Sequence, residues 1–81
     1  MKQFQVVTYS RDIGSDERMD FDGFQAALKE AKKYRLTEEY AAIYDGIFKV
    51  AFVVFGEVST PVFAEGVKVI PLKNVEKEVR I

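Results

Sequence analysis

This chain of 81 residues lacks two of the residue types that most often act as a nucleophile, a general base or a metal ligand. Histidine and cysteine are both absent, which removes the commonest general base, the thiolate nucleophile, disulfides and cysteine-based zinc sites. Ser59 and Thr60 carry hydroxyl groups, but no lysine lies within a few residues to activate them, so we interpret them as a turn before Pro61. We therefore expect a non-enzymatic protein with no catalytic residue, no metal site and no cofactor.

Carboxylates are concentrated near the end of the first quarter of the chain, where they could form a metal or phosphoryl-transfer site or a solvated loop. Their spacing does not match a calcium-binding loop, which needs alternating acids around a glycine and a distal glutamate. Arg11 and Arg18 lie among the acids and would neutralise part of their charge. We therefore favour a solvated polar loop over residues 11–20. The carboxylates are Asp12, Asp16, Glu17, Asp20 and Asp22.

Basic residues cluster a little further along the chain, within a segment that has a helical pattern. They could contact phosphate groups. Alternatively, they form a solvated helix face, where cations near the C-terminal end interact favourably with the helix dipole. We favour the solvated face, because no glycine-rich phosphate loop and no aromatic RNA-binding signature accompanies it. The candidate phosphate contacts are Lys29, Lys32, Lys33 and Arg35.

The strongest helix pattern covers residues 22–36. Asp22 is a good N-cap residue, Gln25 stands where a capping box requires it, and Phe21 could pack back as a hydrophobic staple. Apolar residues recur at helical spacing and would form one stripe that packs on a sheet. The stripe comprises Phe24, Ala27, Leu28, Ala31 and Tyr34.

Strand patterns stand at both ends of the chain. Residues 3–10 are rich in β-branched and aromatic types and predict a first strand. Residues 67–72 predict a last strand, and Pro71 suits the edge or the end of a sheet. The segment 56–66 before it is irregular, with residues 62–64 as a candidate short strand.

Residues 40–55 predict a β-hairpin. The pair Asp45-Gly46 between two apolar runs favours a two-residue type I′ turn, in which Tyr44 would face Ile47. With that register, one hairpin face is wholly apolar and should take the helix: it holds Ala41, Ile43, Phe48, Val50, Phe52 and Val54. The other face holds Tyr40, Ala42, Tyr44, Ile47, Lys49, Ala51, Val53 and Phe55. We expect Phe48 and Phe52 to belong to the core.

The order of these elements predicts an α+β fold. A single helix would pack on one face of a small, mainly antiparallel sheet of three to five strands, in the order strand, helix, strand, strand, strand (β-α-β-β-β). Residues 1–73 would form one domain, and residues 74–81 a tail for which a short strand, a helix turn and disorder all stay open.

One helix can cover only one face of such a sheet, so the second hairpin face would be exposed. An exposed apolar patch usually marks an interface, and aromatic residues are enriched in interfaces. We therefore expect a protein that acts by binding a protein partner or a second copy of itself as a homodimer. The expected interface residues are Tyr40, Tyr44, Ile47, Val53 and Phe55.

The charge balance and hydropathy restrict the other partners. Thirteen acids and twelve bases leave a net charge of −1, which makes nucleic acid the less favoured partner. The alternative function is a small nucleic-acid-binding protein that uses the helix lysines for phosphates and the hairpin tyrosines for bases. The N-terminal residues carry no signal-peptide pattern, and the longest apolar run, residues 50–55, is too short to cross a bilayer. We expect a cytoplasmic protein that does not bind membranes.

The middle of the chain resembles small proteins encoded by bacteriophages and mobile elements. The resemblance is carried by residues 21–33, with the pattern Phe-x-x-Ala-x-x-x-Ala, and by residues 39–46, with the hairpin pattern Tyr-Ala-x-Ile-Tyr-Asp. It implies an accessory or host-takeover protein that acts by binding, such as an inhibitor of a host or defence enzyme. The shared motifs are structural and transfer no site residue.

Overall fold

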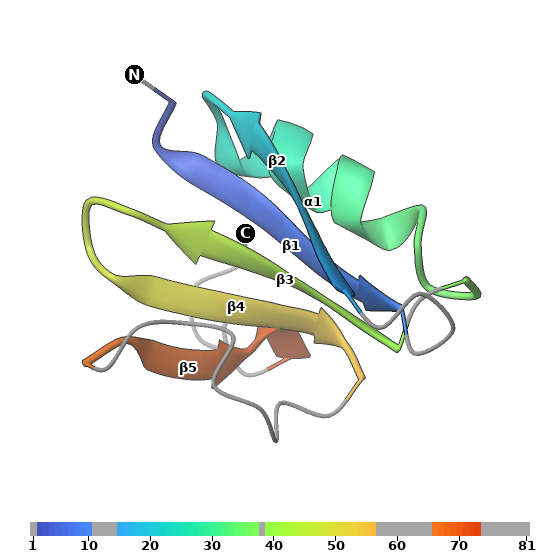
Figure 1. Ribbon diagram of the computed structural model, residues 1–81. Coiled ribbons are helices and arrows are strands. Elements are labelled where there is room, and N and C mark those ends of the chain that lie inside the picture. The colour runs from blue at the N-terminus through green and yellow to red at the C-terminus, as the bar shows by residue number, and fades with distance from the viewer. Residues whose placement is uncertain (1, 11–14, 38, 57–65, 74–81) are drawn as a thin grey trace.

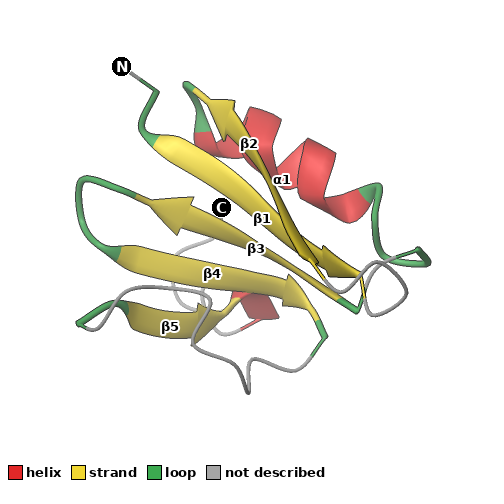
Figure 2. Ribbon diagram, in the orientation of Figure 1, coloured by secondary structure: helices red, strands yellow, loops and turns green. Residues whose placement is uncertain are grey.

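The computed structural model describes residues 2–10, 15–37, 39–56 and 66–73. Within them, one helix packs against one face of a five-stranded sheet (Figures 1 and 2), which confirms the α+β fold class. In chain order the elements are β1 (Phe4–Ser10), β2 (Ser15–Phe21), α1 (Phe24–Lys32), β3 (Tyr40–Asp45), β4 (Val50–Phe55) and β5 (Lys68–Pro71). The candidate strand at 62–64, the turn at 59–61 and the tail at 74–81 lie outside the described residues.

The sheet is mainly antiparallel, as expected. Its strand order is β2-β1-β3-β4-β5, so β3 is central and β2 and β5 are the edges. The first four strands in this order pair antiparallel, whereas β5 lies parallel to β4. Within the described part of the chain, no helix is long and apolar enough to cross a membrane.

Strand β2 is the main difference from the expected order of elements. The polar segment 11–20 is expected to be a loop, but its second half pairs with β1 and places Phe21 opposite Phe4 and Met19 opposite Val6. The expectation is wrong because an edge strand tolerates charged side chains that face water or discourage further pairing. The expected elements keep their order, with β2 inserted before the helix.

Helix α1 is shorter than the predicted segment 22–36, and its N-cap differs. The N-cap is Gly23, without a side-chain hydrogen bond, so the prediction of Asp22 as the cap is wrong. At the other end the chain continues in tight turns, in which the Tyr34 N–H donates to the Ala31 carbonyl at 3.2 Å. The predicted apolar stripe is confirmed at its centre, where Ala27, Leu28 and Ala31 are buried.

The β3–β4 hairpin has a longer loop than predicted. Asp45 pairs with Val50 and Tyr44 with Ala51, so the loop is Gly46–Lys49 and the two-residue type I′ turn is wrong. A register shift between Ala41 and Ala42, the mark of a β-bulge, then leaves Val54 without a partner opposite.

The bulge changes the direction of the residues that follow it. Phe55 pairs with Ala41 and packs against the core under the helix, not on the second face as expected. Phe52, which pairs with Ile43, also packs against this core, as expected.

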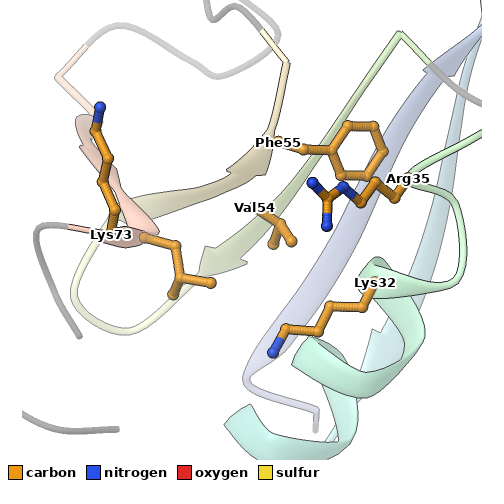
Figure 3. Close-up of a pocket in the computed structure, with 6 residues that line it drawn as sticks. Lys32, Arg35, Val54, Phe55 and Lys73 are labelled. Atoms are coloured by element: carbon orange, nitrogen blue, oxygen red, sulfur yellow. The ribbon is translucent and has the colours of Figure 1, made fainter.

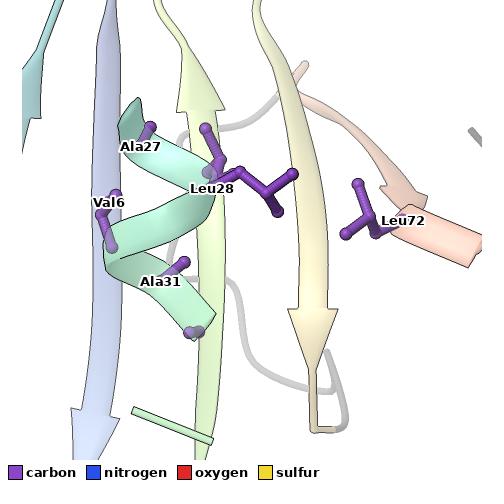
Figure 4. Close-up of a cluster of buried hydrophobic side chains, with 7 residues drawn as sticks. Val6, Ala27, Leu28, Ala31 and Leu72 are labelled. Atoms are coloured by element: carbon purple, nitrogen blue, oxygen red, sulfur yellow. The ribbon is translucent and has the colours of Figure 1, made fainter. Parts of the chain in front are cut away.

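The core lies between α1 and the sheet, where the helix sits over β1 and β3 (Figure 4). Alanines at the contact let the helix approach the strands closely, and Phe24 inserts edge-on between Phe4 and Phe52, with ring centroids 5.7 and 5.2 Å away. The buried members of the core are Val6, Ala27, Leu28, Ala31, Ala41, Ile43 and Leu72.

Candidate functional site

The residues expected to form an exposed sheet-face interface do not form one exposed patch. Tyr40 and Val53 are buried, with exposures of 6% and 8%, and Tyr40 stacks on Tyr9 at a ring-centroid distance of 5.6 Å. Phe55 belongs to the helix side of the sheet, and Tyr44 is half-buried. Their neighbours on the same face, Val7, Ala42 and Ala51, are buried as well. The expectation of an uncovered second face is therefore wrong, because alternation shows which side chains share a face but not what covers them.

Of the five expected interface residues, Ile47 alone is exposed. It is 66% exposed and stands beside Phe48, which is 71% exposed. The predicted register places Phe48 in the core, and this is wrong because the longer loop carries it beyond the end of the paired strands. We call these two adjacent residues the apolar tip.

The side chain of Asp45 holds the loop that carries the apolar tip. One carboxylate oxygen, Oδ1, accepts hydrogen bonds from the Ile47 and Phe48 N–H groups at 3.0 and 3.2 Å. Both carboxylate oxygens accept from Gln3 Nε2 at 3.1 Å. The carboxylate is thus the anchor of the loop, and Asp45 is only 6% exposed.

Backbone bonds fix the two ends of the same loop. The Gly46 N–H donates to the Gln3 carbonyl at 3.0 Å, and the Lys68 N–H donates to the Lys49 carbonyl at 3.1 Å. Lys49 adopts a left-handed conformation with φ of 52°, which closes the loop onto β4. The apolar tip therefore stands on a loop with a defined conformation, and two exposed lysines, Lys49 and Lys68, lie next to each other at the C-terminal end of this loop.

The basic residues of the helix divide into two groups. Lys33 forms an ion pair with Glu30, with 3.0 Å between Nζ and Oε2, and Lys29 is exposed. Lys32 and Arg35 instead line a cleft with a volume of about 450 Å³ (Figure 3). Together with Lys73 they form what we call the basic cleft, whose other described lining residues are Val54, Phe55 and Leu72.

The sequence patterns missed three residues of these two surfaces. The predicted register places Phe48 in the core and Asp45 in the two-residue turn. Lys73 stands far from the helix in the chain, so no local spacing connects it with Lys32 or Arg35. An aspartate two and three residues before Ile47 and Phe48 is the one available signal for the loop, because Asp side chains accept hydrogen bonds from N–H groups a few residues later.

The described carboxylates of the polar segment 11–22 form no group of potential metal ligands. Strand alternation places Glu17 and Asp20 on opposite faces of β2, and Asp20 accepts a hydrogen bond from Gln5 Nε2 at 3.2 Å. No group of three or more potential metal ligands occurs among the residues that the structure describes. Asp12 lies outside them.

Comparisons of the chain with protein-family models, with curated proteins and with solved structures found no match. The resemblance to phage-encoded proteins, carried by residues 21–33 and 39–46, stays a prediction. The apolar tip and the basic cleft are the two surfaces of this chain from which we infer a function.

Proposed function

We propose that this protein is a non-enzymatic binding protein that contacts a protein partner through the apolar tip. The observation that carries the proposal is the high exposure of Ile47 and Phe48 on a loop anchored by the buried Asp45 carboxylate. The absence of histidine and cysteine supports a binding function over catalysis.

The energetics of burial favour the apolar tip as an anchor. Transferring a large apolar side chain from water into a protein pocket contributes about 1.5–3 kcal/mol. Interfaces concentrate their binding energy in a few such side chains, which insert into pockets on the partner. Because Asp45 already orders the loop, less conformational entropy is lost when Ile47 and Phe48 are buried.

The surroundings of the apolar tip define the partner that it fits. Lys49 and Lys68 are exposed and lie next to each other at the C-terminal end of the loop, so the complementary surface is an apolar pocket with acidic groups on that side. The homodimer, in which the partner is a second copy of the chain, is tested separately. The inhibitor-like accessory role that the phage resemblance implies is consistent with a tip of this kind and remains part of the proposal.

The alternative nucleic-acid function has less support. It requires hairpin tyrosines with open ring faces on which bases can stack. Tyr40 is buried and stacks on Tyr9, and Tyr44 is half-buried, so neither presents an open platform.

The proposal predicts that Phe48→Ser weakens partner binding without loss of stability. We expect at least about a tenfold loss of affinity, as for a side chain in an interface hot spot, and a free energy of unfolding within about 0.5 kcal/mol of wild type because the residue is exposed. The immobilised chain would capture the partner from host lysate, and the partner would then be purified and titrated against each variant. The homodimer is tested by sedimentation, which compares the oligomeric state of the free wild-type chain with that of Phe48→Ser.

Leu36→Ser is the matched control, because Leu36 is also a large exposed apolar residue but lies beyond the helix end. It should leave partner binding unchanged. Equal affinity of Phe48→Ser and wild type for the purified partner would contradict the proposal. Binding to phosphatidylcholine vesicles that Phe48→Ser alone removes would contradict it as well, since the tip would then contact lipid.

A further inference from the structure

The basic cleft exists because one helix is too narrow for this sheet. A helix with its side chains is about 10–12 Å wide, whereas five strands at about 4.8 Å spacing extend over about 19 Å. Helix α1 sits over β1 and β3 (Figure 4), so it does not extend across the full width of the sheet. The cleft lies between the end of α1 and the ends of β4 and β5 (Figure 3).

Three cations from two separate parts of the chain line the cleft. Lys32 and Arg35 extend from the helix end, and the Arg35 side chain reaches toward Val54 and Phe55, while Lys73 belongs to the opposite wall (Figure 3). All three are exposed, and no side-chain ion pair or hydrogen bond joins them to any described residue. Lys33, one residue from Lys32, differs in being paired with Glu30.

The last helical carbonyls do not use these cations as hydrogen-bond donors. The last helical carbonyls are already occupied, because the N–H groups of Lys33 and Tyr34 donate to the carbonyls of Glu30 and Ala31 at 3.1 and 3.2 Å. The Arg35 N–H donates to the Lys32 carbonyl at 3.5 Å in the same way. The cleft therefore has a net positive lining among the residues described.

The remaining wall of the cleft is apolar. Val54 and Phe55 are half-buried and Leu72 is buried. A second hollow, also about 450 Å³ in volume, shares Phe55 and Leu72 with the first and continues over Val69 and Pro71. The space joins a cationic rim to an apolar floor, and its size lies within the range of about 300–1,000 Å³ that is usual for small-molecule sites.

We propose that the basic cleft binds a small organic phosphate. Its phosphate group is held by Lys32 and Arg35 at the helix end, with Lys73 adding positive charge from the opposite wall, and its apolar or aromatic group lies against Val54, Phe55 and Leu72. A phosphate monoester carries close to two negative charges and three acceptor oxygens. It therefore matches a cleft lined by several cations better than a ligand with a single carboxylate would. The guanidinium of Arg35 can donate two parallel hydrogen bonds to the phosphate.

The test uses phenyl phosphate as the probe, because it combines a phosphate group with an aromatic ring. Calorimetric titration of the full chain should show binding at least about tenfold tighter for phenyl phosphate than for inorganic phosphate, as expected when an aromatic ring is also buried. Phenol alone should bind far more weakly than phenyl phosphate, because the cations contribute nothing to it.

Charge-removing variants locate the site. Arg35→Gln and Lys32→Gln should each weaken phenyl phosphate binding by about tenfold, the loss that corresponds to one charge-assisted hydrogen bond. Lys33→Gln is the matched control: it removes the same charge one residue away, but outside the cleft lining, and should change the affinity less than about twofold. These residues are exposed, so circular dichroism should show the same fold in all three variants.

Three results would overturn the proposal. One is an equal loss of affinity in Lys33→Gln and Lys32→Gln, which would show a diffuse attraction of anions. Another is equal affinity for inorganic and phenyl phosphate, which would show that the apolar wall does not take part. The last is tight binding of a single-stranded oligonucleotide that phenyl phosphate does not displace, which would assign the basic residues to nucleic acid. Phe48→Ser should leave phenyl phosphate binding unchanged, so this test and that of the apolar tip fail independently.

Discussion

Replacing Gly56 by alanine is expected to lower the free energy of unfolding by about 4 kcal/mol, among the larger effects of a single substitution. Gly56 has a φ of 88°, a conformation that L-residues with a side chain rarely adopt. A Cβ atom there would also lie 2.6 Å from Tyr40 Cβ and 2.8 Å from Tyr40 Cα, and would overlap the carbonyl oxygen of Glu39. These are atoms of the neighbouring chain segment at the start of β3 and cannot move aside as the end of a flexible side chain does.

Gly66→Ala separates backbone strain from the overlap of atoms. Gly66 has a similar φ of 93°, but an added Cβ there would have no atom within 4 Å. We expect this control to lose about 1–2 kcal/mol, the strain contribution alone. Urea unfolding followed by far-ultraviolet circular dichroism measures both variants. Equal unfolding midpoints for the two variants would show that the end of β4 does not pack on the start of β3 as described.

Asp45→Ala is expected to cost about 3 kcal/mol of stability, because hydrogen bonds to a charged group contribute about 1.5–3 kcal/mol each and their loss leaves partly buried donors without this acceptor. The donors that lose their acceptor are the N–H groups of Ile47 and Phe48 and the side-chain amide of Gln3. The loop would lose its defined conformation, so partner binding through the apolar tip should weaken as well.

Two controls define the role of the Asp45 carboxylate. Asp45→Asn keeps one acceptor oxygen for the loop N–H groups and should lose only about 1 kcal/mol. Asp20→Ala removes an exposed carboxylate that also accepts from a glutamine side chain, and should change stability by less than about 0.5 kcal/mol. Amide hydrogen exchange at Ile47 and Phe48 measures the loop directly. Unchanged exchange in Asp45→Ala would show that the carboxylate does not order it.

Local periodicity was sufficient to predict the helix and its buried stripe. Ala27, Leu28 and Ala31 recur on one side of a helix, and that side does pack on the sheet. The same reasoning failed for β2, because its charged residues obscure an alternation that places Met19 opposite Val6 and Phe21 opposite Phe4. An edge strand needs few apolar residues, so composition alone does not distinguish it from a loop.

The hairpin shows how a side chain can override the backbone preference of a turn. An Asp-Gly pair favours a two-residue turn, but Asp45 remains in β3, and its carboxylate accepts from the next loop N–H groups. The bulge beside Val54 then turns Phe55 toward the helix. Neither feature follows from alternation, which assumes an unbroken pairing of the two strands.

The candidate sites were accessible to sequence reasoning only in part. Lys32, Arg35 and Ile47 were identified from residue type and spacing, and the structure places each on one of the two proposed surfaces. Lys73 joins the basic cleft through the position of β5 beside β4, which no local pattern contains. The burial of Tyr40 and Val53 likewise depends on contacts between distant parts of the chain.

Strand β5 is attached to β4 in parallel, unlike the other strand pairs in the described residues, and this distinguishes it kinetically. A parallel pair cannot form from a tight turn, and β5 is a four-residue strand at the edge of the sheet, paired with β4 alone among the described strands. We therefore expect β5 to dock onto β4 late in folding. Leu72 and Lys73 follow this strand directly, so the cleft is complete only once β5 has docked. A ligand bound across the cleft would stabilise the docked β5, so the fraction of molecules in which β5 is released should fall as the ligand concentration rises.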